Sequence, residues 1–247
     1  MKVFFSIVAL LSLFSVSAQI KSDTIIQDQR LKFDYKSLII PSILVGYGII
    51  GIESDGIKYY NSEIKHELNE NIDEKFTIDD FSQYVPFVSV YALNGLGLQG
   101  KHDFKDRTII LATAYLLMGG TVYALKTTTK VERPDGSTNN SFPSGHTATA
   151  FMGAEFLYQE YKDISVWYGI TGYLVAAGTG FFRMYNDRHW LTDVVAGAGI
   201  GIISTKVAYW LHPVIEKKIF KSKKKSNKIA MPFYNGKQYG VGVAITF

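Results

Sequence analysis

Residues that could bind and cleave a phosphate ester gather in three short stretches of the chain. These are KTTTKVERP at residues 126–134, PSGH at 143–146 and FRMYNDRHWLTD at 182–193. Three of their cations, Lys126, Arg133 and Arg183, are candidates for binding phosphate. An arginine fork binds a tetrahedral oxyanion through two parallel hydrogen bonds, and a lysine adds a point charge. The composition therefore indicates a phosphate site.

The second stretch has the features of a helix start. Ser144 is a good N-cap residue, and Gly145 lets the backbone approach a ligand closely. The free N–H groups of a first helical turn favour a bound anion. We therefore expect a helix to begin here, with His146 in its first turn beside the phosphate.

Two imidazoles accompany the cations. His189 and Asp193 are four residues apart, which places them on the same face of a helix. The carboxylate can accept a hydrogen bond from one ring nitrogen and leave the other free as a nucleophile. His146 has no such partner in its own segment. Two imidazoles around one phosphate suggest two tasks, attack on phosphorus and protonation of the departing oxygen.

The order and spacing of these residues resemble the three-part signature of the type 2 phosphatidic acid phosphatase (PAP2) family. That family also includes bacterial class A acid phosphatases and vanadium haloperoxidases. The match covers roughly residues 80–212, and the spacing agrees in all three parts. One position departs, because the family usually has serine where this chain has Phe182. A hydroxyl contact to phosphate is lost there, while the nucleophile and its carboxylate are intact.

The resemblance implies a role for each residue. His189 is the nucleophile that forms a phosphohistidine, Asp193 orients it, and His146 is first the acid and then the base. Neither a metal nor another cofactor is implied, because the cations already supply the charge that a metal would provide. The residues implied to hold the phosphoryl oxygens are Lys126, Arg133, Ser144, Gly145 and Arg183.

Long uncharged runs must form the elements that position this site. They cover residues 37–52, 81–100, 108–125 and 164–182, and residues 189–211 are also mostly apolar. Runs of 18 to 20 residues can cross a hydrocarbon layer of about 30 Å as helices. The sequence thus predicts an all-α bundle of about five or six mostly transmembrane helices. The low mean hydropathy of +0.06 keeps a compact, soluble all-helical domain as the alternative.

The chain divides into four predicted parts. Residues 1–18 read as a signal peptide or an N-terminal anchor. Residues 19–80 hold a polar lead-in, the short apolar run and an amphipathic cap helix over 55–80, whose apolar positions recur every fourth residue. Residues 81–212 form the catalytic bundle. Residues 213–247 form a basic tail and a small β-hairpin, which is predicted from Asn235-Gly236 and the alternation after it.

Composition narrows the class of partner. The chain has no cysteine, which excludes disulfides and thiolate catalysis. Seven lysines within residues 217–228 more than account for the net charge of +4. This local tail gives no nucleic-acid-binding face, so the expected partners are a lipid phosphate substrate and the membrane.

We therefore expect a bacterial envelope phosphatase that acts on lipid phosphates. The candidate substrates are phosphatidic acid, phosphatidylglycerol phosphate, undecaprenyl diphosphate and the phosphates of lipid A. The alternatives are a soluble periplasmic acid phosphatase, a vanadate-dependent haloperoxidase and a non-catalytic protein with a relic motif.

Orientation rests on two signals that conflict. The basic tail favours the cytoplasm, which places the active site of an inner-membrane protein in the periplasm. A cleaved signal agrees with this only if residues 37–52 do not cross, and sixteen residues give only about 24 Å of helix. We therefore expect that run to dip into the membrane or to lie along the bundle. If residues 3–18 are instead not translocated, all six apolar runs cross, the sixth being the mostly small and apolar residues 147–158.

Overall fold

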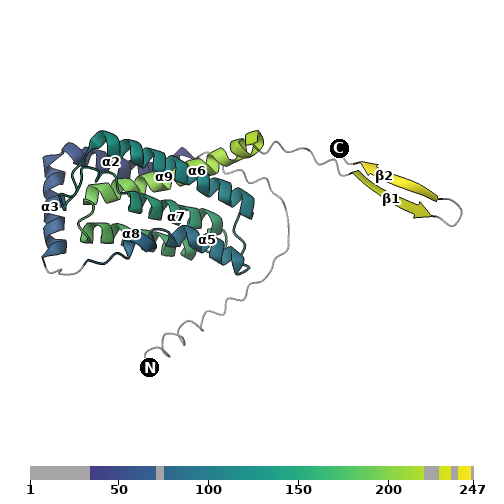
Figure 1. The fold of residues 1–247 in the computed structure, drawn as a ribbon, viewed down its shortest axis with the longest axis horizontal. Coiled ribbons are helices and arrows are strands. Elements are labelled where there is room, and N and C mark those ends of the chain that lie inside the picture. The colour runs from purple at the N-terminus through teal and green to yellow at the C-terminus, as the bar shows by residue number, and fades with distance from the viewer. Residues whose placement is uncertain (1–33, 71–74, 220–227, 235–238, 246–247) are drawn as a thin grey trace, which may run out of the picture. The chain divides into compact units, whose positions relative to one another are not determined.

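The computed structural model describes residues 34–70, 75–219, 228–234 and 239–245. Most of these residues are helical, which confirms the predicted helical class. A short 3-10 helix, η1 (Tyr35–Leu38), precedes the α-helices (Figure 1). In chain order these are α2 (Ile39–Glu53), α3 (Asp55–Asn69), α4 (Asp79–Ser82), α5 (Val85–Gly95), α6 (Phe104–Thr129), α7 (Gly145–Tyr161), α8 (Val166–Tyr185) and α9 (Leu191–Ile219).

Helix α7 lies inside the bundle, with α5, α6, α8 and α9 packed against it (Figure 1). Thirteen of its seventeen residues are buried. Small residues such as Ala148, Ala150 and Gly153 permit this, because they let neighbouring backbones approach closely. Met152 and Phe156 of α7 join residues of α6 and α9 in the main apolar core.

Glycines set the distance between α7 and α9. A Cβ atom added at Gly201 would lie 2.3 Å from the carbonyl oxygen of Ala148, and one at Gly197 would lie 2.6 Å from that of Ser144. The two backbones therefore touch along this line. Because Ser144 caps α7, the packing of α9 also fixes the start of α7.

Alanine at Gly201 is expected to lower the free energy of unfolding by about 1–3 kcal/mol, the usual cost of overpacking. The matched control is Gly119→Ala in α6, where nothing lies within 4 Å of the added Cβ. The control should be neutral or more stable by up to about 1 kcal/mol, because alanine is the better helix former. Unfolding in detergent measures both variants. Equal stability of the two would contradict the close backbone contact.

Helix α2 runs antiparallel to α9. A Cβ atom at Gly199 would lie 2.5 Å from the carbonyl oxygen of Pro41, near the start of α2. One at Gly51, near its end, would lie 2.4 Å from the side chain of Thr192, at the start of α9. The end of α2 thus lies beside the start of α9, and the start of α2 lies beside Gly199, within the first half of α9.

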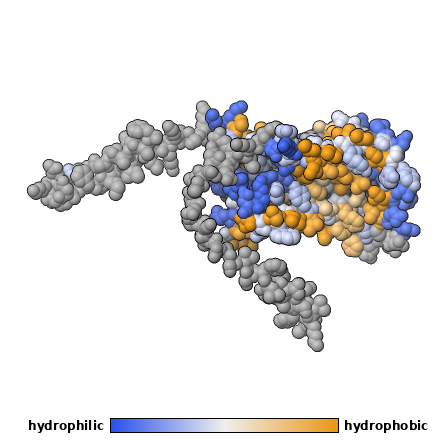
Figure 2. All heavy atoms as spheres, turned by 180° about the vertical axis from the view of Figure 1, so that it is seen from behind, coloured by the Kyte–Doolittle hydropathy of each residue, from blue (hydrophilic) through white to orange (hydrophobic). Residues whose placement is uncertain are grey.

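Three helical segments in the described part of the chain are long and apolar enough to cross a membrane. They are Tyr35–Glu53, Phe104–Thr129 and Leu191–Lys218. On one face of the molecule, hydrophobic surface lies between hydrophilic ends (Figure 2). Large apolar side chains such as Ile40 of α2 and Leu116 of α6 are more than two-thirds exposed, which fits contact with lipid. The number of crossings remains a prediction.

The first of these segments corrects an expectation. Residues 37–52 alone are too short to cross a membrane, but η1 and α2 together form a segment of nineteen residues, Tyr35–Glu53. At 1.5 Å per residue its length is about 28 Å. The three extra residues are Tyr35 and Lys36 before the uncharged run and Glu53 after it. A helix can continue into charged residues, so the end of an uncharged run does not mark the end of a helix.

The amphipathic helix also differs from its predicted bounds. Helix α3 ends at Asn69 instead of reaching residue 80, and Phe76 lies outside any helix. An apolar residue at every fourth position drifts by about 40° per step around a helix. The repeat from Tyr60 to Phe76 therefore cannot keep one straight apolar edge, and Tyr60 is 64% exposed.

Helix α3 crosses the end of the bundle, as expected for a cap (Figure 1). The Asn61 amide donates a hydrogen bond to the Thr192 hydroxyl at 3.0 Å. The Lys65 ammonium donates to the carbonyl oxygen of Pro134 at 2.6 Å. These contacts tie α3 to the start of α9 and to the loop after α6.

Near the C-terminus, strands β1 (Lys228–Tyr234) and β2 (Tyr239–Ile245) pair antiparallel, with Tyr234 opposite Tyr239. The predicted turn at Asn235-Gly236 lies outside the described residues, so the complete hairpin remains a prediction. The predicted signal or anchor at residues 1–18 also lies outside them.

Candidate active site

The structure brings the three polar stretches to one end of the bundle. Helices α6 and α8 end there, and α7 and α9 begin there. The backbone N–H of Ser144 donates a hydrogen bond to the carbonyl oxygen of Asp193 at 3.0 Å. The Lys126 ammonium donates to the carbonyl oxygens of Asn140 and Ser141. These hydrogen bonds hold the three stretches together.

His189 and Asp193 form a buried pair. Their exposed fractions are 3% and 1%, and His189 Nδ1 lies 3.5 Å from Asp193 Oδ2. The same carboxylate oxygen accepts hydrogen bonds from the Ser141 hydroxyl and, at 2.9 Å, from the Trp190 backbone N–H. The Ser141 hydroxyl is also 3.4 Å from His189 Nδ1. One side of the imidazole is thus fixed, and Nε2 is left for a substrate.

Burial controls the charge of this imidazole. Loss of solvent lowers the pKa of His189 to about 4, although Asp193 opposes the shift. Lys126 and Arg183 lower it further. At neutral pH the ring is therefore uncharged and has the lone pair that a nucleophile needs.

The placement of His189 corrects one detail of the sequence analysis. We expected His189 and Asp193 on one face of a helix, but α9 begins at Leu191, so His189 precedes it. Asp193 accepts the hydrogen bond of the Trp190 backbone N–H, which would otherwise lack a partner at the start of the helix. The two residues before Leu191 therefore lie outside the helix, and His189 still reaches Asp193 from there.

The predicted phosphate-binding cations lie near one another. Arg183 is 7% exposed, and its Nε has no hydrogen-bond partner in the described part of the chain. Arg133 Nε donates to Asn140 Oδ1 at 3.0 Å. Burial and the nearby charge of Arg183 lower the pKa of Arg133. Close cations with an unused buried donor form a suitable setting for an oxyanion.

Ser144 is the N-cap of α7, as predicted, and its side chain accepts a hydrogen bond from the Thr147 backbone N–H. Gly145 is the first residue of the helix, and His146 follows in the first turn. The free backbone N–H groups of this turn add a further set of donors near the cations.

Two acidic residues of α4 complete the site and were missed in the sequence analysis. Asp80 Oδ1 lies 3.0 Å from His146 Nε2. The neighbouring Asp79 accepts a hydrogen bond from Arg183 and is 1% exposed. A signal was available, since this pair contains the last charges before the uncharged run 81–100.

Phe182 belongs to an aromatic group. Its ring contacts those of Phe181 and Tyr185, with centroids 5.7 and 5.8 Å apart. Where the PAP2 signature usually has a serine hydroxyl, this chain therefore has an aromatic side chain packed against other rings.

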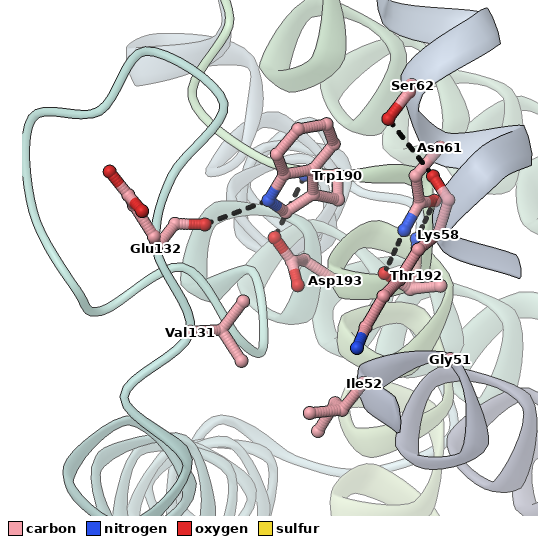
Figure 3. Close-up of a pocket in the computed structure, with 10 residues that line it drawn as sticks. All are labelled: Gly51, Ile52, Lys58, Asn61, Ser62, Val131, Glu132, Trp190, Thr192 and Asp193. Atoms are coloured by element: carbon pink, nitrogen blue, oxygen red, sulfur yellow. Dashed lines mark hydrogen bonds between the residues drawn. The ribbon is translucent and has the colours of Figure 1, made fainter. Parts of the chain in front are cut away.

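A cavity of about 290 Å³ lies beside the nucleophile pair, between the end of α2, helix α3 and the loop after α6 (Figure 3). Trp190 forms part of its wall, held by a 2.8 Å hydrogen bond from Nε1 to the carbonyl oxygen of Glu132. Lys58 and Asp193 also line it. The site thus adjoins open space beneath the cap helix.

Comparisons with known proteins agree with the motifs. Residues 107–217 match the model of the PAP2 superfamily, which confirms the predicted resemblance. A lipid A 1-phosphatase of Porphyromonas gingivalis is 42% identical over 139 residues, which are 56% of this chain and 31% of that protein. The bacitracin transport permease protein BcrC of Bacillus licheniformis is 32% identical over 105 residues, 36% of this chain and 48% of that protein. The chain thus spans less than half the length of these two relatives.

Two solved structures are also similar. The crystal structure of Aquifex aeolicus LpxE is 27% identical, with a TM-score of 0.47, and the match covers 60% of this chain and 94% of that chain. A transmembrane PAP2-type phosphatidylglycerolphosphate phosphatase from Bacillus subtilis is 20% identical, with a TM-score of 0.44 and coverage of 73% and 97%.

Proposed function

We propose that this protein, whose residues 107–217 match the PAP2 superfamily model, is a membrane phosphatase that hydrolyses lipid phosphates through a phosphohistidine at His189. The observation that carries the proposal is the buried His189 held by Asp193 beside the cations Lys126, Arg133 and Arg183. An imidazole with a free lone pair beside a cationic oxyanion site suits transfer of a phosphoryl group to histidine.

The reaction has two steps. His189 Nε2 attacks phosphorus, the bond between phosphorus and the lipid oxygen breaks, and His146 gives that oxygen a proton. Water then attacks the phosphohistidine while His146 takes a proton from that water, and the nitrogen–phosphorus bond breaks to release phosphate. In both steps the three cations, with Ser144 and Gly145 at the helix start, stabilise the charge on the equatorial oxygens.

The substrate class follows from the surface and from the relatives. Exposed apolar side chains on α2 and α6 favour a substrate that arrives from a lipid layer, and they disfavour the soluble acid phosphatase. Among lipid phosphates we place the 1-phosphate of lipid A first, because the P. gingivalis relative is a lipid A 1-phosphatase. Phosphatidic acid, phosphatidylglycerol phosphate and undecaprenyl diphosphate are the competing substrates.

The proposed function is tested by release of phosphate from this panel by the purified protein in micelles with EDTA. Turnover should persist with the chelator, because side-chain cations supply the charge a metal would provide. Vanadate should inhibit, since it mimics the five-coordinate transition state. Activity that is lost in EDTA and restored by one divalent metal would instead make His189 and Asp193 metal ligands. No release from any lipid phosphate would refute the proposal.

We further propose that the site faces the periplasm. Lys217 and Lys218 lie in the last turn of α9, which begins at the site, so these cations mark the opposite end of the bundle. The antiparallel α2 starts beside Gly199, farther from the site than its end at Thr192. If α2 crosses, the start of α2 and the basic tail share the cytoplasmic side, as the positive-inside rule favours. This is the alternative in which residues 3–18 are not translocated.

Single cysteines can test this orientation, because the chain has none of its own. Gly136 has a φ of +69°, which disfavours a side chain, so its exposed neighbour Ser137 is the better site. Ser137→Cys should react with an impermeant thiol reagent on intact spheroplasts. Lys218→Cys should react only after the membrane is broken. The opposite order of labelling would place the active site in the cytoplasm.

A further inference from the structure

His146 has a carboxylate partner that comes from a distant part of the chain. Asp80, 66 residues earlier, places Oδ1 3.0 Å from His146 Nε2. This pair is more exposed than the pair of His189 and Asp193, since the side chains of His146 and Asp80 are 31% and 52% exposed. The site therefore contains two imidazole–carboxylate pairs, one buried and one partly exposed.

The position of Asp80 is fixed by its neighbours. Its carbonyl oxygen accepts a 2.9 Å hydrogen bond from the buried Gln83 amide. Next to it, Asp79 accepts from Arg183 and, at 2.9 Å, from Asn186. The Ser82 hydroxyl is 2.7 Å from that of Thr179 in α8. A four-residue helix with this many anchors holds its side chains in defined places.

The two acidic residues have different tasks. Asp79 is buried and holds one end of the Arg183 guanidinium. Asp80 is 3.6 Å from Arg183 Nη1 but hydrogen-bonds His146. One carboxylate thus positions a phosphate-binding cation, and the other contacts the second imidazole.

The charges near His146 oppose one another. Burial and the positive charge of Arg183 in α8 lower its pKa, whereas Asp80 and, more weakly, Asp79 in α4 raise it. A general acid must carry a proton when the leaving oxygen departs. Without a nearby carboxylate, the cations proposed to bind phosphate would lower the pKa of His146 and disfavour its protonated form.

We propose that Asp80 is the positioning residue of His146: its carboxylate accepts the Nε2–H hydrogen bond, fixes the ring and keeps it able to deliver a proton to the leaving oxygen. This inference rests on the proposed function and assigns a further residue to the same site.

The proton can then be followed through the cycle. With Nε2–H donated to Asp80, Nδ1–H of the imidazolium goes to the lipid oxygen as the phosphorus–oxygen bond breaks. Bare Nδ1 then accepts a proton from the water that attacks the phosphohistidine. Asp80 keeps its charge throughout. The arrangement mirrors the other pair, where Asp193 holds Nδ1 of His189 and leaves Nε2 free for phosphorus.

Asp80→Asn is the decisive variant. The kcat for lipid phosphates, whose alkoxide leaves poorly, should fall on the order of tenfold to a hundredfold, while p-nitrophenyl phosphate should be little affected. The rate requires protonated His146 and is lost as pH rises through its pKa. Removal of the carboxylate lowers that pKa, so the alkaline limb of the pH profile of kcat should move toward lower pH. Asp80→Glu should restore both the kcat for lipid phosphates and the position of the alkaline limb.

Two further comparisons separate this role from a structural one. In a His146→Ala background, Asp80→Asn should cause no further loss, because the two residues act through one proton. Asp79→Asn should instead weaken inhibition by vanadate, through Arg183, and should move the alkaline limb less than Asp80→Asn does. NMR titration of the His146 ring, carried out without substrate, should give a lower pKa in Asp80→Asn than in the wild type.

Opposite outcomes would overturn the inference. If Asp80→Asn turned over lipid phosphates faster than the wild type and bound vanadate more tightly, Asp80 would be an anion that competes with the substrate. Equal losses on good and poor leaving groups with an unmoved alkaline limb would make its role structural. In both cases the wild type still hydrolyses lipid phosphates, so the proposed function would stand.

Discussion

Replacement of His189 by alanine is expected to lower the turnover of lipid phosphates by at least about four orders of magnitude. The variant lacks the nitrogen that forms the covalent intermediate, and the remaining cations can only bind the substrate. The acid-labile phosphoenzyme, trapped by rapid quench with a radiolabelled substrate, should disappear with it. Binding of vanadate should be weakened much less than turnover.

The control is His66→Ala, the same chemical change on an exposed position of α3. It should retain nearly normal turnover and a normal phosphoenzyme level. A His189→Ala protein with near-normal rates on a lipid phosphate would exclude the phosphohistidine mechanism.

The second large effect is expected for His146→Ala, and it should depend on the leaving group. With lipid phosphates, whose oxygen must be protonated as it departs, kcat should fall about 10²–10⁴-fold. With p-nitrophenyl phosphate, whose leaving oxygen needs little help, formation of the phosphoenzyme should stay close to that of the wild type. Burst kinetics on both substrates separate the first step from hydrolysis of the intermediate.

Because His146 also serves as the base for water, the phosphoenzyme should accumulate in this variant when the leaving group is good. A uniform loss on both substrates, without accumulation, would mean that His146 only holds the phosphate or the helix start.

The sequence predicted those parts of the site that depend on local spacing. The cap of α7 at Ser144 follows from one residue type before a helix, and the cluster of cations follows from where the apolar runs end. The link between Asp80 and His146 could not be predicted in this way, because the residues are 66 positions apart and meet only after α4 packs against α8. The same holds for Ser141 at the nucleophile pair, 48 residues from His189.

Element boundaries were predicted less well, for physical reasons. A four-residue apolar repeat suggested one helix over residues 55–80, although such a repeat drifts around the helix, and α3 ends at Asn69. The uncharged run 37–52 suggested a short segment, but the helix continues into charged residues at both ends. Charge patterns locate apolar cores better than they locate helix ends.

The contact between the start of α7 and α9 has a consequence for biosynthesis. In the described part of the chain, α6 and α9 are long and apolar enough to cross a membrane, and α7 and α8 lie between them in the sequence. Helix α7 carries the buried Glu155, whose carboxylate meets Lys206 of α9 at 2.7 Å. α9 also supplies Asp193 and the glycines that seat Ser144. The start of α7 and the proposed nucleophile therefore come together only when α9 packs against α7, so under the proposed function a nascent chain that lacks α9 is expected to be inactive on lipid phosphates.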